Sequence, residues 1–165
     1  MKKILFTITA IVAFAVGSHA QEISKNAIGV RLGDGKGFGA ELNYQRAISE
    51  RNRLEFGLSA RNSVRKNENT SAVKLIGIYQ WVWNIDGGFN WYAGPGIGVG
   101  QVVFDKNDFD NRSNEVYAFA AGDIGVEYSF DFPLLISVDF RPELGFGDYR
   151  NDVLFDVGIS ARYQF

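Results

Sequence analysis

The sequence predicts an all-β chain in which eight antiparallel strands, joined in up-and-down order, close into a barrel behind a cleaved signal peptide. Two observations lead to this prediction. From residue 26 onward apolar and polar side chains alternate with a period of two, and no window shows a sustained helical period. Such alternation is typical of strands whose two faces meet different surroundings. The alternating segments number eight, most of about nine to twelve residues, longer than the five or six typical of globular sheets.

The first twenty residues have the three-part layout of a secretory signal peptide. Two lysines follow the initial Met, residues 4–16 form an apolar run, and small side chains precede Gln21. The apolar run is shorter than the ~20 residues that a membrane-spanning helix needs. We therefore expect residues 1–20 to be removed, leaving one barrel domain over residues 21–165. The only histidine, His19, leaves with the peptide.

The first four strands are predicted from alternation that is clean in three of them. In the first, Ile28, Val30 and Leu32 share one face, and Gly and Arg side chains share the other. The second and third alternate apolar residues with Glu, Asn, Gln, Ser and Gly in the same way. The fourth is mixed, because isoleucines fall on the same face as Lys74 and Gln80. These strands are expected at residues 28–33, 38–45, 54–61 and 72–83.

The last four strands alternate over longer stretches. The fifth places apolar residues opposite a row of four glycines, Gly94, Gly96, Gly98 and Gly100. Glycine weakens a strand and often marks a place where another group comes close, so we expect this row to leave room for long Arg and Glu side chains. The other three place apolar residues opposite acids, arginines and small residues. The four are expected at residues 91–100, 118–129, 136–145 and 155–165.

The predicted connections alternate in length along the chain. Three are short, at residues 47–52, 84–88 and 131–133. Two are longer and polar, at residues 62–71 and 104–115, and residues 147–151 are intermediate. Outer-membrane barrels have short periplasmic turns and longer external loops. With both termini in the periplasm, all the longer connections would lie outside the cell.

The polar face decides between a membrane barrel and a soluble one. It carries charges of both signs and many glycines, and aromatic residues gather near the strand ends, as in the interfacial girdles of membrane barrels. We therefore expect a transmembrane barrel with a buried ion-pair network inside. The alternative is a secreted soluble barrel that binds a small apolar ligand, with Ile28, Val30 and Leu32 pointing inward. The expected network comprises Arg31, Glu41, Glu55, Arg61, Lys74, Asp123, Glu127, Asp139, Arg141, Glu143, Asp156 and Arg162.

Two segments resemble a known family. Residues 155–165 resemble the final strand of bacterial outer-membrane β-barrels, and residues 91–100 are similar to the Tyr-x-Gly-x-Gly-x-Gly strand of small porin-like barrels. The chain thus resembles the family of outer membrane protein A's membrane domain and outer membrane protein X. The resemblance implies an integral outer-membrane protein whose Tyr163 and Phe165 are read by the barrel-assembly machinery. It also implies contacts with outer-membrane lipid and lipopolysaccharide, and we expect a monomer.

Composition argues against several functions. The chain has no cysteine, loses its histidine with the signal peptide, and has a net charge of −2, which gives no basic footprint for nucleic acid. Proton transfer through a histidine is therefore excluded from the mature chain, and no cofactor is expected. Carboxylate-only chemistry would have to use Asp139 and Glu143, where the intervening Arg141 favours ion pairs. An eight-stranded barrel is only just wide enough for its own side chains, so no wide pore is expected, and a narrow transport pore is the weaker alternative.

Overall fold

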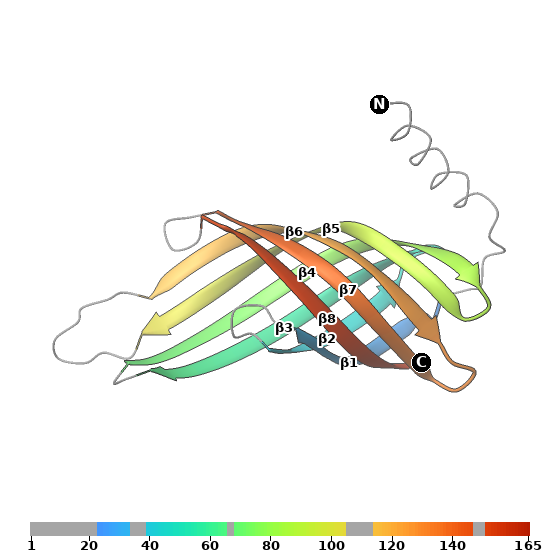
Figure 1. Cartoon of the computed structure of the whole chain (residues 1–165), viewed down its shortest axis with the longest axis horizontal. Coiled ribbons are helices and arrows are strands. Elements are labelled where there is room, and N and C mark those ends of the chain that lie inside the picture. Colours follow the sequence, from blue (N-terminus) through green and yellow to red (C-terminus); the bar gives the residue numbers. More distant parts are fainter. Residues whose placement is uncertain (1–22, 34–38, 66–67, 105–113, 147–150) are drawn as a thin grey trace, which may run out of the picture.

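The computed structural model of the chain is a closed antiparallel barrel (Figure 1). It describes residues 23–33, 39–65, 68–104, 114–146 and 151–165, and for residues 61–65, 68–70 and 104 the backbone alone. Each strand pairs with its neighbours in sequence, and the first pairs with the last, which confirms the predicted fold class. No helix among these residues is long and apolar enough to cross a bilayer. The strands are β1 (Asn26–Gly33), β2 (Ala40–Ala47), β3 (Asn52–Arg65), β4 (Glu68–Asp86), β5 (Phe89–Phe104), β6 (Glu115–Ser129), β7 (Leu134–Phe146) and β8 (Val153–Gln164).

Side chains alternate between the outside and the inside of the barrel, as the period of two requires. On β1, Ile28, Val30 and Leu32 are 52%, 43% and 54% exposed on the outer surface, while Arg31 is buried inside. The same inversion holds along β8, where Val157 and Ile159 lie outside. A soluble barrel that binds an apolar ligand requires Ile28, Val30 and Leu32 to point inward. Their exposure on the outer surface contradicts this alternative.

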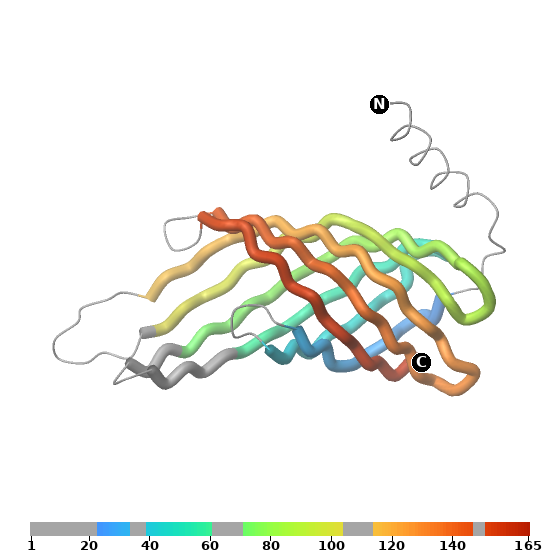
Figure 2. Tube along the Cα trace, in the orientation of Figure 1, coloured from blue at the N-terminus to red at the C-terminus, as the bar shows by residue number. Residues whose placement is uncertain are grey.

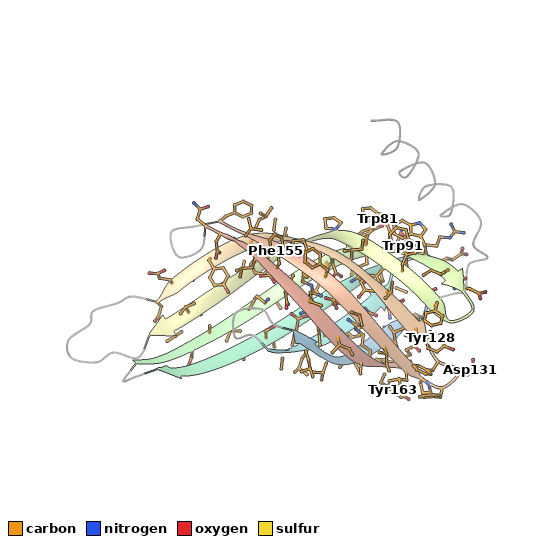
Figure 3. All side chains as sticks on the ribbon, viewed as in Figure 1. Trp81, Trp91, Tyr128, Asp131, Phe155 and Tyr163 are labelled. Carbon is orange, nitrogen blue, oxygen red and sulfur yellow. The ribbon has the colours of Figure 1, made fainter. Side chains whose placement is uncertain are left out.

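Aromatic side chains gather on the outer surface at the end where the short connections lie. Figure 3 shows Tyr128 and Tyr163 near the turn that holds Asp131, and Trp81 and Trp91 beside each other farther around the barrel toward the same end. Several of these rings touch: the Trp83 and Trp91 rings are stacked with centroids 4.2 Å apart, and the Phe89 and Tyr128 rings are 4.5 Å apart. This end of the barrel therefore has a collar of large amphipathic and apolar rings.

The prediction of a loop at residues 62–71 is wrong. The β3–β4 ladder continues through these residues to the pair Arg65 and Glu68, so only residues 66–67 separate the two strands. The segment thus continues the two strands, which extend beyond the ends of β1 and β2 (Figure 1). Most of the other two predicted outer connections, and the predicted signal peptide, lie outside the described residues.

The glycine row of β5 makes room for aromatic rings, an isoleucine side chain and neighbouring backbone. A Cβ at Gly98 or Gly100 would meet the rings of Phe119 or Tyr117, which lie opposite on β6. A Cβ at Gly94 or Gly96 would meet the backbone of β4 or the Ile78 side chain. The expectation that this row accommodates Arg and Glu side chains is therefore wrong. Aromatic rings that cover glycines stabilise a sheet locally. The space is used by a charged group elsewhere: a Cβ at Gly57 would meet the Glu41 carboxylate.

Gly94 and Gly77 give a matched test of this close packing. A Cβ at Gly94 would collide with the backbone oxygen of Tyr79, whereas one at Gly77 would meet nothing nearer than the Phe56 ring at 3.8 Å. We expect Gly94→Ala to lower the free energy of unfolding by about 1–3 kcal/mol and Gly77→Ala to leave it unchanged or slightly higher. Reversible urea unfolding in detergent micelles measures both, and an equal effect of the two substitutions would contradict the packing described here.

Candidate functional site: the charged lumen

The interior of the barrel holds most of the predicted charged residues. Eleven of the twelve have described side chains, and each of these is only 1–4% exposed. Arg61 lies in β3, but its side chain is outside the described part of the chain. The two residues of the predicted assembly signal lie elsewhere: Tyr163 and Phe165 are each 58% exposed, and Tyr163 lies on the outer surface (Figure 3).

Arg141, on β7, lies at the centre of the lumen. It donates from Nη1 to Glu41 Oε1 and from Nη2 to Glu55 Oε1, both at 3.0 Å. Its Nε lies 3.6 Å from Asp123 Oδ1, too far for a hydrogen bond, and neither atom has a hydrogen-bond partner among the described residues. One guanidinium thus faces three carboxylates from β2, β3 and β6. Such a group compensates charges that would otherwise be costly to bury.

The sequence neighbours of Arg141 pair with other cations. Asp139 accepts hydrogen bonds from Arg31, and Glu143 accepts one from Lys74 Nζ at 2.8 Å. Both acids therefore lie in ion pairs with cations other than the arginine between them. Residues two apart on a strand point the same way but stand about 7 Å apart, so Arg141 bonds instead to acids across the barrel.

Glu55 connects the central group to the end with the short connections. Its Oε2 accepts from Arg162 Nη2 at 3.1 Å and from Gln45 Nε2 at 2.6 Å. Arg162 also donates to Asn43 Oδ1 at 3.1 Å and to Ser137 Oγ at 2.7 Å. A single hydrogen-bonded group therefore joins strands β2, β3, β7 and β8 through the interior.

One charged residue of the lumen was not predicted from the sequence. Arg53 donates from Nη1 and Nη2 to the two oxygens of Glu127, at 3.0 and 2.7 Å, and from Nε to Gln80 at 2.6 Å. It also lies over the Tyr92 ring, 4.8 Å from the centroid. The signal was present, because Arg53 is two residues before Glu55 and shares its face. It was missed because the predicted third strand began at residue 54.

Another part of the lumen, lined by β4, β5 and β6, is apolar. Side chains from β4, β5 and β6 form a buried cluster there, and Lys74 Nζ lies 5.7 Å from the centroid of the Phe119 ring in this cluster. The isoleucines that made the fourth strand look mixed belong to this cluster. The interior is thus partly a charged network and partly an ordinary core. The cluster consists of Ala72, Ile76, Ile78, Val102, Tyr117, Phe119 and Ala121.

The described part of the lumen buries charged groups of both signs. Seven acids and five bases are buried among its side chains. At the end with the short connections, a cavity of about 20 Å³ lies beside Arg53, Glu127 and Gln164, which is room for about one water molecule. No group of His, Cys, Asp and Glu among the described residues is arranged to hold a metal ion. The arrangement can hold the strands together and exclude water, and each arginine is shared among acceptors on several strands.

Known structures include proteins with a similar fold. Searches of protein-family models and of curated proteins found no match. Among solved structures, the chain is similar to Ail, the attachment invasion locus protein of Yersinia pestis, with 15% identity and a TM-score of 0.57 over 86% of this chain and 97% of that one. It is similar to the N-terminal β-barrel domain of Pseudomonas aeruginosa OprF, with 12% identity and a TM-score of 0.63 over 86% and 98%.

A third similar structure is Neisserial surface protein A, with 12% identity and a TM-score of 0.56 over 85% of this chain and 94% of that one. Ail is an outer membrane protein, also determined in a phospholipid bilayer nanodisc. At these identities the likeness establishes the fold. The chain therefore has the fold of the small eight-stranded outer-membrane β-barrels, the family that residues 91–100 and 155–165 resemble.

Proposed function

We propose that the protein is an integral β-barrel of a Gram-negative outer membrane, with a structural and surface-interaction role and no catalysis. The observation that carries this proposal is the inversion of the barrel, apolar outside and charged inside. In water, the exposed apolar rows on every strand would form a continuous patch far larger than monomeric soluble proteins carry. In a bilayer, the same apolar rows contact lipid instead of water, and the charged side chains are inside the lumen, away from the lipid.

The height of the apolar band supports the proposal. Along β4 it runs from Val73 to Trp83 on the outer face. At about 3.3 Å per residue and a strand tilt of about 40°, these ten steps span roughly 25 Å. Outer-membrane barrels carry an apolar band of about that height. The aromatic collar at one end corresponds to the place where Trp and Tyr prefer the lipid–water boundary.

The lengths of the connections support an orientation. The short connections, the start of β1 and the end of β8 lie at the end with the aromatic collar (Figure 1), and short turns are periplasmic in such barrels. The ends of β3 and β4 and of β5 and β6 that lie away from the short connections would then face the outside of the cell, and the sequence between β5 and β6 is polar. The description of Ail as an attachment invasion locus protein and of the Neisserial protein as a surface protein supports a surface-interaction role.

The proposed partners follow from this placement. Lipid and lipopolysaccharide would contact the outer band, and the assembly machinery would read Tyr163 and Phe165 during biogenesis, with the barrel a monomer. The filled lumen supports a barrel without a wide pore, because Arg141, Arg162 and Arg53 bridge strands across the interior. A structural role for the ion-pair network explains its burial without invoking chemistry at Asp139 and Glu143.

The proposal is tested by expressing the full chain in a Gram-negative host. We expect the protein in the outer-membrane fraction, resistant to urea and alkaline carbonate extraction and released by detergent. Its electrophoretic mobility should change on boiling, and its intact mass should correspond to a chain that begins at Gln21. Recovery in the soluble periplasm would contradict the membrane location, and a chain that keeps residues 1–20 would contradict the signal peptide alone.

A further inference from the structure

The boundary between β1 and β8 differs from the other seven boundaries of the barrel wall. It is the one boundary that no connecting segment spans, because β1 opens the barrel and β8 closes it. Its ladder of seven pairs is as short as the β1–β2 and β2–β3 ladders, whose strands are joined by a connection, and half as long as the β3–β4 ladder. β1 and β8 lie side by side along this seam (Figure 2). Side chains that bond across this boundary therefore add to the ladder where no connection joins the strands.

Arg31 bonds across this seam from β1. Its Nε donates to Asp139 Oδ1 on β7 at 2.9 Å, and its Nη1 donates to Asp156 Oδ2 on β8 at 2.6 Å. Its Nη2 donates to Asp139 Oδ1 at 2.5 Å. The guanidinium and both carboxylates are buried. The planar fork of arginine can engage two acids in fixed directions, so one side chain ties β1 to both strands beyond it.

The backbone around Arg31 is shaped to admit its guanidinium. A Cβ at Gly158, on β8, would meet Arg31 Cζ, Nε and Nη2. A Cβ at Gly33 would meet Arg31 Nη1 and the Asp156 carboxylate. Glycine interrupts a strand at a cost in stability, and at these two positions the space it leaves is filled by this ion pair.

Arg162 bonds across the seam in the opposite direction. It lies on β8, opposite Gly29 of β1, and its Nε donates to Asn43 on β2. A Cβ at Gly29 would collide with the backbone of Ala161 and Arg162. The two arginines therefore lie on opposite sides of the seam. Arg31 on β1 bonds to β7, and Arg162 on β8 bonds to β2.

We propose that Arg31 and Arg162 form a clasp that holds the β1–β8 seam closed, and that the barrel opens first at this seam when the clasp is lost. The proposal depends on the closed fold and not on the membrane in which the barrel resides. It can therefore be tested on purified, refolded protein in detergent, and its failure would leave the proposed function intact.

The test uses the absence of cysteine from the chain. One disulfide is introduced across the seam with Val30→Cys and Ala161→Cys, and a second across β5–β6 with Val99→Cys and Ala118→Cys. Each pair lies directly opposite in its ladder, with the side chains outside the barrel. Opposite residues in antiparallel ladders have Cα atoms about 4.5–5.5 Å apart, within the range that disulfides span.

Arg31→Gln is then compared with Arg53→Gln, a buried arginine of the β3–β6 side. Thermal unfolding is followed by circular dichroism, with and without each disulfide. We expect each substitution alone to lower the midpoint by roughly 10 °C. The seam disulfide should remove at least half of the loss caused by Arg31→Gln and little of the loss caused by Arg53→Gln. The β5–β6 disulfide should rescue neither.

The proposal is overturned if the loss from Arg31→Gln is the same with and without the seam disulfide, or if Arg53→Gln is rescued to the same extent. Gly158→Ala is measured in the same way, because it crowds the guanidinium without removing its charge. It decides the question if Arg31→Gln does not refold. Preferential rescue of Gly158→Ala by the seam disulfide supports the clasp, and equal or absent rescue overturns it.

Discussion

Replacing Arg141 with methionine is expected to lower the free energy of unfolding by about 4 kcal/mol, because it removes one partner of a buried ionic group. Glu41 and Glu55 would each lose a hydrogen bond of 3.0 Å, and Asp123 would lose the cation 3.6 Å away. Removal of the cation leaves these three buried carboxylates without it, while methionine keeps much of the volume.

The measurement is reversible urea unfolding of refolded protein in detergent micelles. Arg46→Met serves as the control, because Arg46 is exposed and bonds only to Asn26 Oδ1 among the described contacts; we expect a change of about 1 kcal/mol or less. Adding Glu41→Gln to Arg141→Met should recover part of the loss. A loss no larger than that of the control would show that Arg141 does not compensate the central carboxylates.

Replacing Ile97 with arginine is expected to lower the free energy of unfolding in a lipid bilayer by about 2–4 kcal/mol, the cost of a cation near the bilayer midplane. Ile97 is 75% exposed on the outside of β5, opposite Gly77 near the middle of the apolar band. On a water-facing strand such a change would cost almost nothing, because exposed substitutions away from special features usually stay within about 0.5 kcal/mol.

Ile85→Arg provides the matched control, since Ile85 is also exposed but lies at the end of β4 with the short connections. The cost there should be about 0–1 kcal/mol, because charged groups are tolerated near the interface. Both variants are refolded into phospholipid vesicles and unfolded reversibly in guanidinium. Equal costs at Ile97 and Ile85, or a neutral Ile97→Arg, would argue against lipid on the outer face.

The fold was predictable from the sequence because it follows from a local rule. A period of two determines which side chains share a face. Eight such segments with short connections favour a barrel in which each strand pairs with its neighbours in sequence. The same rule assigned eleven of the described lumen charges, from Arg31 to Arg162, to one face. It failed at strand ends: Arg53 was missed by one residue, and the polar residues of the β3–β4 hairpin were taken for a loop.

The partners of each charge were not predictable from the sequence. Arg141 bonds to Glu41 and Glu55 rather than to its strand neighbours, and which strands meet across the lumen depends on the stagger of the closed barrel. The ring positions were also hidden. Tyr117 and Phe119 have the aromatic character of membrane-facing residues, yet they cover glycines inside. Alternation predicts which face of a strand a side chain occupies. Which residues it contacts depends on the register of the strands in the closed barrel.

The central claim, that the apolar outer face lies in lipid, is tested most directly by fluorescence quenching at one position. The native tryptophans are replaced with Trp81→Phe, Trp83→Phe and Trp91→Phe, and a single tryptophan is introduced with Ile97→Trp. The protein is refolded into vesicles of lipids brominated at defined depths along the acyl chain. The structure predicts strong quenching, greatest for bromine near the chain ends, and little quenching by aqueous iodide. Efficient quenching by iodide with none from brominated lipid would contradict the account.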